Sequence, residues 1–140
     1  MTMNTVATII AAVQDVVAAV TGIRTAPDIP PDQIAGGGVV ALVYPATGRF
    51  SVIAAPNREE GLHTLHLMLA TPYANMRTDW ARIITLGDTV PRALLNAGTM
   101  TATIIQINEL RYTFGNLEWG GQQMFGWMFE VDVLATGSLT

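Results

Sequence analysis

The chain begins with apolar residues that recur every three or four positions, the spacing of one helix face. This period predicts an amphipathic helix of about four turns, with Asn4 or Thr5 as its N-cap and Gly22 as its end. The apolar stripe consists of Val6, Ile9, Ile10, Val13, Val17 and Val20.

A second helical period covers Met76–Ala97, between the cap Asn75 and the terminator Gly98. Gly87 and Pro91 interrupt the stretch. The pattern therefore predicts either one kinked helix or two short ones, since proline fits the first turn of a helix. The apolar positions are Trp80, Ile83, Ile84, Val90, Leu94 and Leu95.

The segment between the two helices alternates between apolar and polar positions, as strands do. Two short strands, Val39–Tyr44 and Arg49–Ala54, are predicted to form a hairpin around the turn Pro45–Gly48. A third strand is predicted over Leu62–Thr71. Its alternation places His63, Leu65, Leu67 and Leu69 on one face and Thr64, His66 and Met68 on the other.

Six of the ten aromatic residues lie between Ile107 and Val133, in two strand-like runs around Trp119-Gly120-Gly121. The first run, Thr101–Leu117, is predicted as one long, bulged strand. In the second, Phe125, Trp127, Phe129, Val131 and Val133 share one face, while Met124, Met128, Glu130 and Asp132 share the other. One face is expected to build the core and the other to meet something polar.

The element order is helix, three strands, helix and two strands. Since short turns connect consecutive strands, the simplest packing is a single, mainly antiparallel sheet of about five strands with both helices on one face. The sequence thus predicts an α+β fold, organised as one domain over residues 1–140.

Composition narrows the chemistry. The chain has no cysteine, which excludes disulfides and thiolate chemistry, and its only fixed positive charges are seven arginines, since it has no lysine. A net charge of −4 argues against tight binding of nucleic acid. Only 13% of residues are charged and 50% are hydrophobic, so either apolar surface is covered in a homo-oligomer or the chain is a well-packed monomer.

The apolar N-terminal stretch does not fit a targeting or membrane segment. It lacks a basic leading region and contains Asn4, Gln14 and Asp15. No membrane association is expected, and a cytoplasmic origin is predicted.

Three segments are candidates for contact with a partner. The Pro-rich stretch from Arg24 to Gly38 is either a contact arm or a plain linker. The charged stretch Asn57–Glu60 is expected to be a loop tip. Trp119, at the hairpin turn, either folds back as a lid or is offered to a partner. The candidate interface residues are Arg24, Pro27, Asp28, Pro30, Pro31, Arg58, Glu59, Glu60, Trp119, Gly120 and Gly121.

Candidate catalytic or metal-binding groups are few. His63 and His66 point to opposite faces of a strand and cannot chelate together. Glu130 and Asp132 share a face about 7 Å apart, a spacing that hydrolysis or a hard cation could use, but no third ligand is evident. The ordinary reading is a solvated acidic face, so no catalytic residue, metal or cofactor is expected.

Several segments together resemble the tail terminator family of long-tailed bacteriophages. The resemblance rests on Gly22-Ile23-Arg24, the arm Ala26–Asp32, the strand Gly61–Leu65, the middle helix around Leu94-Leu95, and the closing hairpin with Arg111-Tyr112, Trp119-Gly120-Gly121 and Gly126. It covers most of the chain.

The resemblance implies a small α+β virion subunit, assembled in the host cytoplasm, that forms a hexameric ring at the head-proximal end of the tail tube. The ring would contact the tail tube protein, stop tube growth and offer its other side to the head-tail connector, or stopper, protein. DNA would pass without specific binding, through a channel for which Glu118 and Asp132 are the candidate acidic residues, with Glu59 and Glu60 as further exposed candidates. Six copies carry about −24 of net charge, which repels DNA.

Other functions remain open from the sequence. The chain is alternatively a neck connector or tail completion protein, or a tail tube subunit with a similar sheet. From another class, it is a small enzyme or ligand-binding domain that uses Glu130, Asp132 and His66.

Overall fold

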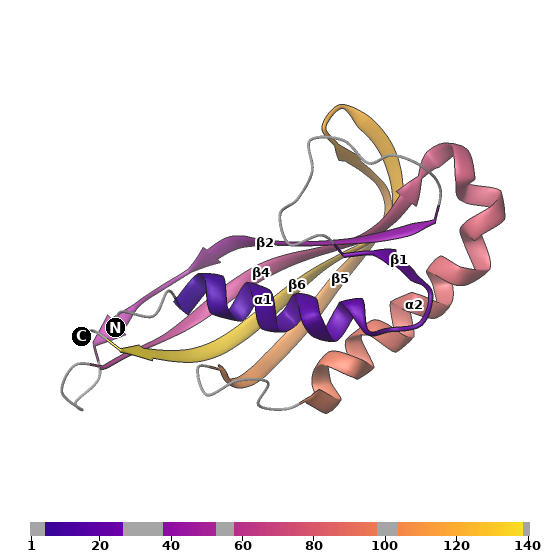
Figure 1. The fold of residues 1–140 in the computed structure, drawn as a ribbon. Coiled ribbons are helices and arrows are strands. Elements are labelled where there is room, and N and C mark those ends of the chain that lie inside the picture. Colours follow the sequence, from indigo (N-terminus) through magenta and orange to yellow (C-terminus); the bar gives the residue numbers. More distant parts are fainter. Residues whose placement is uncertain (1–4, 27–37, 53–57, 98–103, 139–140) are drawn as a thin grey trace.

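The structure is a computed structural model that describes residues 5–26, 38–52, 58–97 and 104–138 (Figure 1). One curved sheet forms the body of the protein, and both helices lie against the same face of it. This confirms the α+β class and the predicted order of helices and main strands. The elements are α1 (Thr5–Ala18), β1 (Ile23–Thr25), β2 (Val39–Gly48), β3 (Ser51–Val52), β4 (Arg58–Pro72), the 3-10 turn η1 (Tyr73–Asn75), α2 (Met76–Ala97), β5 (Ile104–Trp119) and β6 (Gln122–Ser138).

The second helix is continuous. Although Gly87 and Pro91 lie inside it, α2 runs without a break from Met76 to Ala97, so of the two predicted alternatives the structure has a single helix and not two short ones. The first helix ends at Ala18, four residues before the glycine that was expected to stop it.

The sheet has six strands, including the two short ones, in the order β1-β2-β4-β6-β5, with β3 also paired to β4. All pairs are antiparallel except β1 with β2. Arg24 therefore lies in a strand, although the sequence predicted a loop from that residue.

The predicted hairpin around Pro45–Gly48 is wrong. Strand β2 continues through these four residues to Gly48, and both β2 and β3 pair with β4 instead of with each other. A register shift between Pro45 and Thr47 accommodates the proline on this strand. Proline is tolerated there because β1 pairs with β2 only at Val39 and Val40, so at Pro45 one side of β2 has no ladder partner among the described residues.

The closing hairpin agrees with the sequence prediction. Strand β5 is long and carries two register shifts, and it pairs with β6 up to Trp119 opposite Gln122. Gly120 and Gly121 form the two-residue turn, both with positive φ, which favours glycine.

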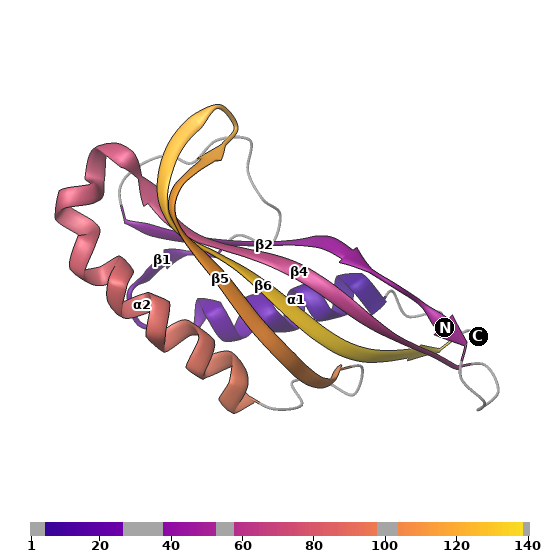
Figure 2. The same cartoon turned by 180° about the vertical axis from the view of Figure 1, so that it is seen from behind.

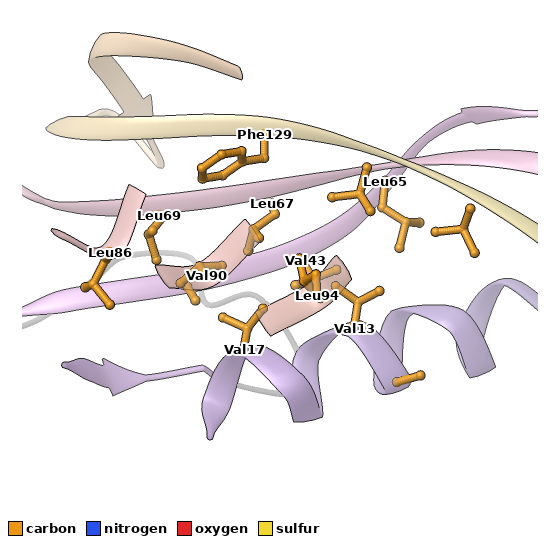
Figure 3. Packing of buried hydrophobic residues seen from close by; sticks show 14 of the residues in the cluster. Val13, Val17, Val43, Leu65, Leu67, Leu69, Leu86, Val90, Leu94 and Phe129 are labelled. Carbon is orange, nitrogen blue, oxygen red and sulfur yellow. The ribbon is translucent and has the colours of Figure 1, made fainter. Parts of the chain in front are cut away.

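The main core lies between the sheet and the two helices (Figure 3). Val13 and Val17 of α1 and Leu86, Val90 and Leu94 of α2 meet the sheet residues, and each such fully buried side chain stabilises the fold by roughly 1.5–3 kcal/mol. The sheet contributes Val39, Ala41, Val43, Leu65, Leu67, Leu69, Phe125, Phe129, Val131, Val133 and Ala135. The predicted alternation of both central strands is thereby confirmed.

The opposite face of the sheet carries a second apolar cluster, which the sequence interpretation missed. Its buried members are Val40, Leu42, Met68, Ala70 and Met124. The hairpin end of β5 and β6 curls away from the helices and over this face (Figure 2). The face is thus apolar under the curl, and polar only farther along the strands.

Gly126 permits this curl. A Cβ added at this position would lie closer than 3.0 Å to the backbone of Leu69 and Ala70 in the neighbouring strand, so no other residue fits without displacing the backbone.

Candidate functional site

Aromatic side chains gather where α2 meets β5 and β6. Trp80 of α2 stacks on Phe125 at 6.1 Å between ring centroids and meets Phe114 edge-on at 5.9 Å. On the strands, Tyr112 and Phe114 pack against Trp127, at 5.1 Å and 4.6 Å. Aromatic pairs at these separations each add about 0.5–1.5 kcal/mol beyond area burial.

The inner side of this cluster is anchored to the helix. The Trp127 indole Nε1 donates a 2.8 Å hydrogen bond to the Ile83 carbonyl. The ring lies so close to Gly87 that an added Cβ would overlap it. Glycine in a helix interior is thus explained by packing, although it costs about 1 kcal/mol relative to alanine.

The outer side of the cluster faces solvent. The exposed fractions are 64% for Tyr112, 49% for Trp80 and 38% for Phe114, and Ile84 on the next turn of α2 is also exposed. We call Trp80, Ile84, Tyr112 and Phe114 the aromatic edge. Tyr112 and Phe114 project from the helix side of β5, the last strand of the sheet order, and Trp80 and Ile84 come from α2.

Most of the exposed large apolar side chains in the described part of the chain belong to the two elements that form the aromatic edge. Of the seven large hydrophobic side chains that are exposed in the described part of the chain, five come from α2 and β5. Concentration on one surface, rather than scatter, is what distinguishes a binding surface from ordinary exposed apolar residues. The five are Trp80, Ile84, Leu95, Tyr112 and Phe114.

A second apolar feature lies at the far end of the sheet. Phe50, 60% exposed, packs edge-on against the His63 ring at 4.7 Å, beside a cavity of about 200 Å³. We call this cavity the Phe50 pocket. Its lining residues are Val6, Pro45, Ala46, Thr47, Gly48, Phe50, His63, Thr64 and Leu65.

His63 is buried in the wall of this pocket. Burial lowers the pKa of its imidazole, and the nearby Glu59 carboxylate partly opposes that shift. Its Nε2 has no hydrogen-bond partner among the described residues. Burial therefore favours the neutral form of the ring.

The acidic pair on the opposite face is not free. Arg111 of β5 reaches both carboxylates, with its Nη1 2.7 Å from Asp132 and its Nη2 2.8 Å from Glu130, and it also pairs with Glu109. The Thr64 hydroxyl donates a 2.6 Å hydrogen bond to Asp132. The Arg111 hydrogen bonds hold the pKa of Asp132 below its usual range, and the three carboxylates raise the pKa of Arg111.

Asp132 was predicted to be exposed, and this is wrong, while its assignment to a channel stays a prediction. Only 8% of the residue is exposed, because it lies under Arg111 between β4 and β5. With both carboxylates held by one guanidinium, neither Glu130 nor Asp132 is placed to share a proton or a cation in the way that hydrolysis requires. The other channel candidate, Glu118, is exposed near the hairpin turn.

Trp119 folds back over the sheet. Its ring lies 5.5 Å from that of Tyr44, and it covers the second apolar cluster. Burial there raises the pKa of Tyr44, whose hydroxyl contacts the Met128 sulfur. Trp119 therefore takes the position predicted for a lid. The turn residues Gly120 and Gly121 are exposed at the tip of the hairpin.

The predicted contact residues of the Pro-rich stretch lie mostly outside the described part of the chain. Pro27, Asp28, Pro30 and Pro31 lie outside the described residues, while Arg24 is exposed on β1.

The stretch around Arg58 was expected to be a loop tip, and this is wrong. Arg58, Glu59 and Glu60 begin β4, where they pair with β6, and the two glutamates also pair with β3. Both glutamates are only half-exposed, and Arg58 donates a 3.1 Å hydrogen bond to the Thr136 hydroxyl.

The sequence interpretation missed the aromatic edge and the Phe50 pocket. A partial signal was present, since Trp80, Ile84 and Leu95 fall on one side of the α2 helix wheel, offset from the buried stripe of Ile83 and Val90. Which strand lies beside that stripe depends on the sheet order, which the pattern did not contain.

In the described ranges no three histidine or acidic side chains cluster as a metal site would require. Neither described helix combines the length and the apolar character of a membrane span. A scan against protein-family models gave no match to the chain, and a search of curated proteins gave no significantly similar sequence. Function therefore has to be inferred from the surfaces of the protein.

Proposed function

We propose that this chain is a structural virion subunit that assembles into a ring at the head-proximal end of a phage tail tube. The ring ends tube polymerisation and provides the surface for head-to-tail joining. The observation that carries this proposal is the aromatic edge, a concentrated apolar surface beside the outermost strand of the sheet.

Three further features support an assembly role. The α+β fold with both helices on one face is the kind of subunit that the resemblance to tail terminators implies. The net charge of −4 per copy suits a ring through which DNA slides, and Glu118 is an exposed carboxylate that could face such a channel. Arg111 occupies the acidic pair that a catalytic or metal-binding role would have used.

The proposed role fixes where the protein sits on a particle. Antibody labelling of intact virions is expected to mark one position, between the head and the tail tube. Label along the whole tube would instead identify a tube subunit. Absence of the protein from purified particles would overturn the proposal.

A neck connector or tail completion protein would be labelled at the same place. The two are separated by tails assembled in the absence of heads, because a terminator stays bound to the end of free tails while a connector stays with the head.

A further inference from the structure

The two apolar surfaces of the subunit differ in shape and lie far apart. The aromatic edge packs around Trp127, which is opposite Leu69 on β4, whereas the Phe50 pocket surrounds His63 near the start of the same strand. The six residue steps between those β4 positions span roughly 20 Å along the strand. One subunit therefore cannot bring its own aromatic edge to its own pocket.

We propose that the aromatic edge of one copy docks into the Phe50 pocket of a second copy, so that the contact is head-to-tail. This inference deepens the proposed ring function and rests on it. The occupant of each surface is the other surface on an identical chain.

The shapes are complementary. Tyr112 is the most exposed side chain of the aromatic edge, at 64%, while the pocket is a shallow hollow of about 200 Å³ lined mainly by apolar atoms of Val6, Pro45, Ala46, Phe50 and Leu65. A cavity of this size is below the roughly 300–1,000 Å³ of small-molecule sites, and fits one aromatic anchor better. Aromatic side chains seated in pockets are the usual centres of protein interfaces.

The contact also brings one pair of opposite charges toward each other. Arg77 is exposed on the first turn of α2 beside Trp80, and together with Met76 these residues line a hollow of about 340 Å³. At the other end, Glu59 is close enough to the pocket to act on the pKa of His63. Docking the aromatic edge into the pocket brings a cation toward the end of the subunit that carries this carboxylate.

The symmetry of the assembly follows from the fact that the two contact surfaces differ. A contact between two different surfaces of the same chain is heterologous, so each added copy leaves one edge and one pocket free. Such contacts close into rings when the rotation between copies allows it, and otherwise form filaments. A dimer through two aromatic edges would instead be isologous and would stop at two copies.

Chemical crosslinking distinguishes these cases, and the chain is suited to it because it contains no cysteine. One variant carries Ala46→Cys at the pocket, and another carries Asn116→Cys, two residues from Phe114 on the same face of β5. Both sites are exposed. A short bismaleimide then links only thiols that meet across a contact.

The head-to-tail contact predicts that neither single variant crosslinks with itself, that a mixture of the two gives a dimer, and that the double variant gives a ladder ending at a closed ring. Self-crosslinking of Asn116→Cys alone would show an isologous contact and overturn the proposal. A double variant that stays monomeric would overturn it too.

A charge reversal tests the surface without disturbing the core. Arg77→Glu is expected to weaken self-association at least about tenfold, as loss of a strong interface residue does. The matched control is Arg92→Glu, an exposed arginine farther along α2 that pairs with Asp88 and is expected to leave self-association unchanged. Equal effects of the two variants would contradict the assigned surface.

Failure of this inference differs from failure of the proposed function. A missing ladder from a protein that still stops tube growth removes only the assigned contact. A complete ladder from a protein that does not stop tube growth removes the terminator role.

Discussion

The Trp127 indole lies directly against Gly87, which is the one residue of α2 without a Cβ. Its Nε1 donates to the Ile83 carbonyl one turn earlier. This contact fixes strand β6 against helix α2, and it thereby positions the residues of the aromatic edge.

Gly87→Ala is predicted to destabilise the protein by about 1–3 kcal/mol, because the added methyl group overpacks against Trp127. Helix propensity alone predicts the opposite sign, a gain of about 1 kcal/mol. Urea unfolding at neutral pH measures the difference. Thr89→Ala, at an exposed position of the same helix, serves as control and is expected to change stability little. A more stable Gly87→Ala variant would refute the packing explanation.

Gly126→Ala is predicted to cost about 1–3 kcal/mol, since its Cβ would collide with the backbone of β4. Gly115 is the matched control: it is the cross-strand partner of Gly126 and has a similar positive φ, but an added Cβ there meets nothing within 4 Å. Both substitutions strain the backbone, so the difference between their unfolding free energies isolates the collision. Equal losses would mean that β4 does not limit the curl.

Arg111→Met is predicted to destabilise the fold at neutral pH by an amount that shrinks as the solution is acidified. Asp132 has a lowered pKa in the fold, so its contribution is present above its usual pKa of 3.8 and is lost as the pH falls through the folded value. Without Arg111 the largest cause of that lowered pKa is removed.

Unfolding curves of the Arg111→Met variant and the parent protein at pH 7 and near pH 3 test this dependence. Arg92→Met, which removes an exposed ion pair on α2, is expected to change little at either pH. A destabilisation by Arg111→Met that is the same at both pH values would contradict the assignment to Asp132.

His63 is predicted to make the protein less stable below about pH 6.5. Its folded pKa is lowered, so the unfolded chain binds a proton more readily, and stability present above pH 6.5 declines as the pH falls through the folded pKa. His63→Leu is expected to flatten the decline at little cost, because the buried Nε2 has no partner among the described residues. His66→Leu retains His63 and is expected to keep the decline; the same profile for both variants would refute this role.

The sequence predicted the features that depend on the local spacing of apolar residues. The span of α2 and the two faces of β6 follow from spacing alone, so Phe125, Phe129 and Val131 could be assigned to the core. The glycine turn at Gly120-Gly121 likewise follows from residue type.

Features that depend on pairing could not be read in this way. Arg111 neutralises Asp132 because β5 and β6 align in one register, and 21 positions separate the two residues in sequence. Pro45 suggested a turn, but an edge strand with a bulge absorbs it. The uninterrupted apolar run Val39–Val43 was a usable sign that β2 is covered on both faces, which is the second apolar cluster.

The growth of tail tubes is the most direct test of the proposed terminator role. Tube subunits from the same genome would be polymerised with and without this protein, and tube lengths measured in electron micrographs. We expect the tubes to stop elongating and to carry the protein at one end. Arg77→Glu is expected to weaken this limit on tube length, while Arg92→Glu is not. Tubes that elongate equally with and without the protein, and carry none of it at their ends, would contradict the account.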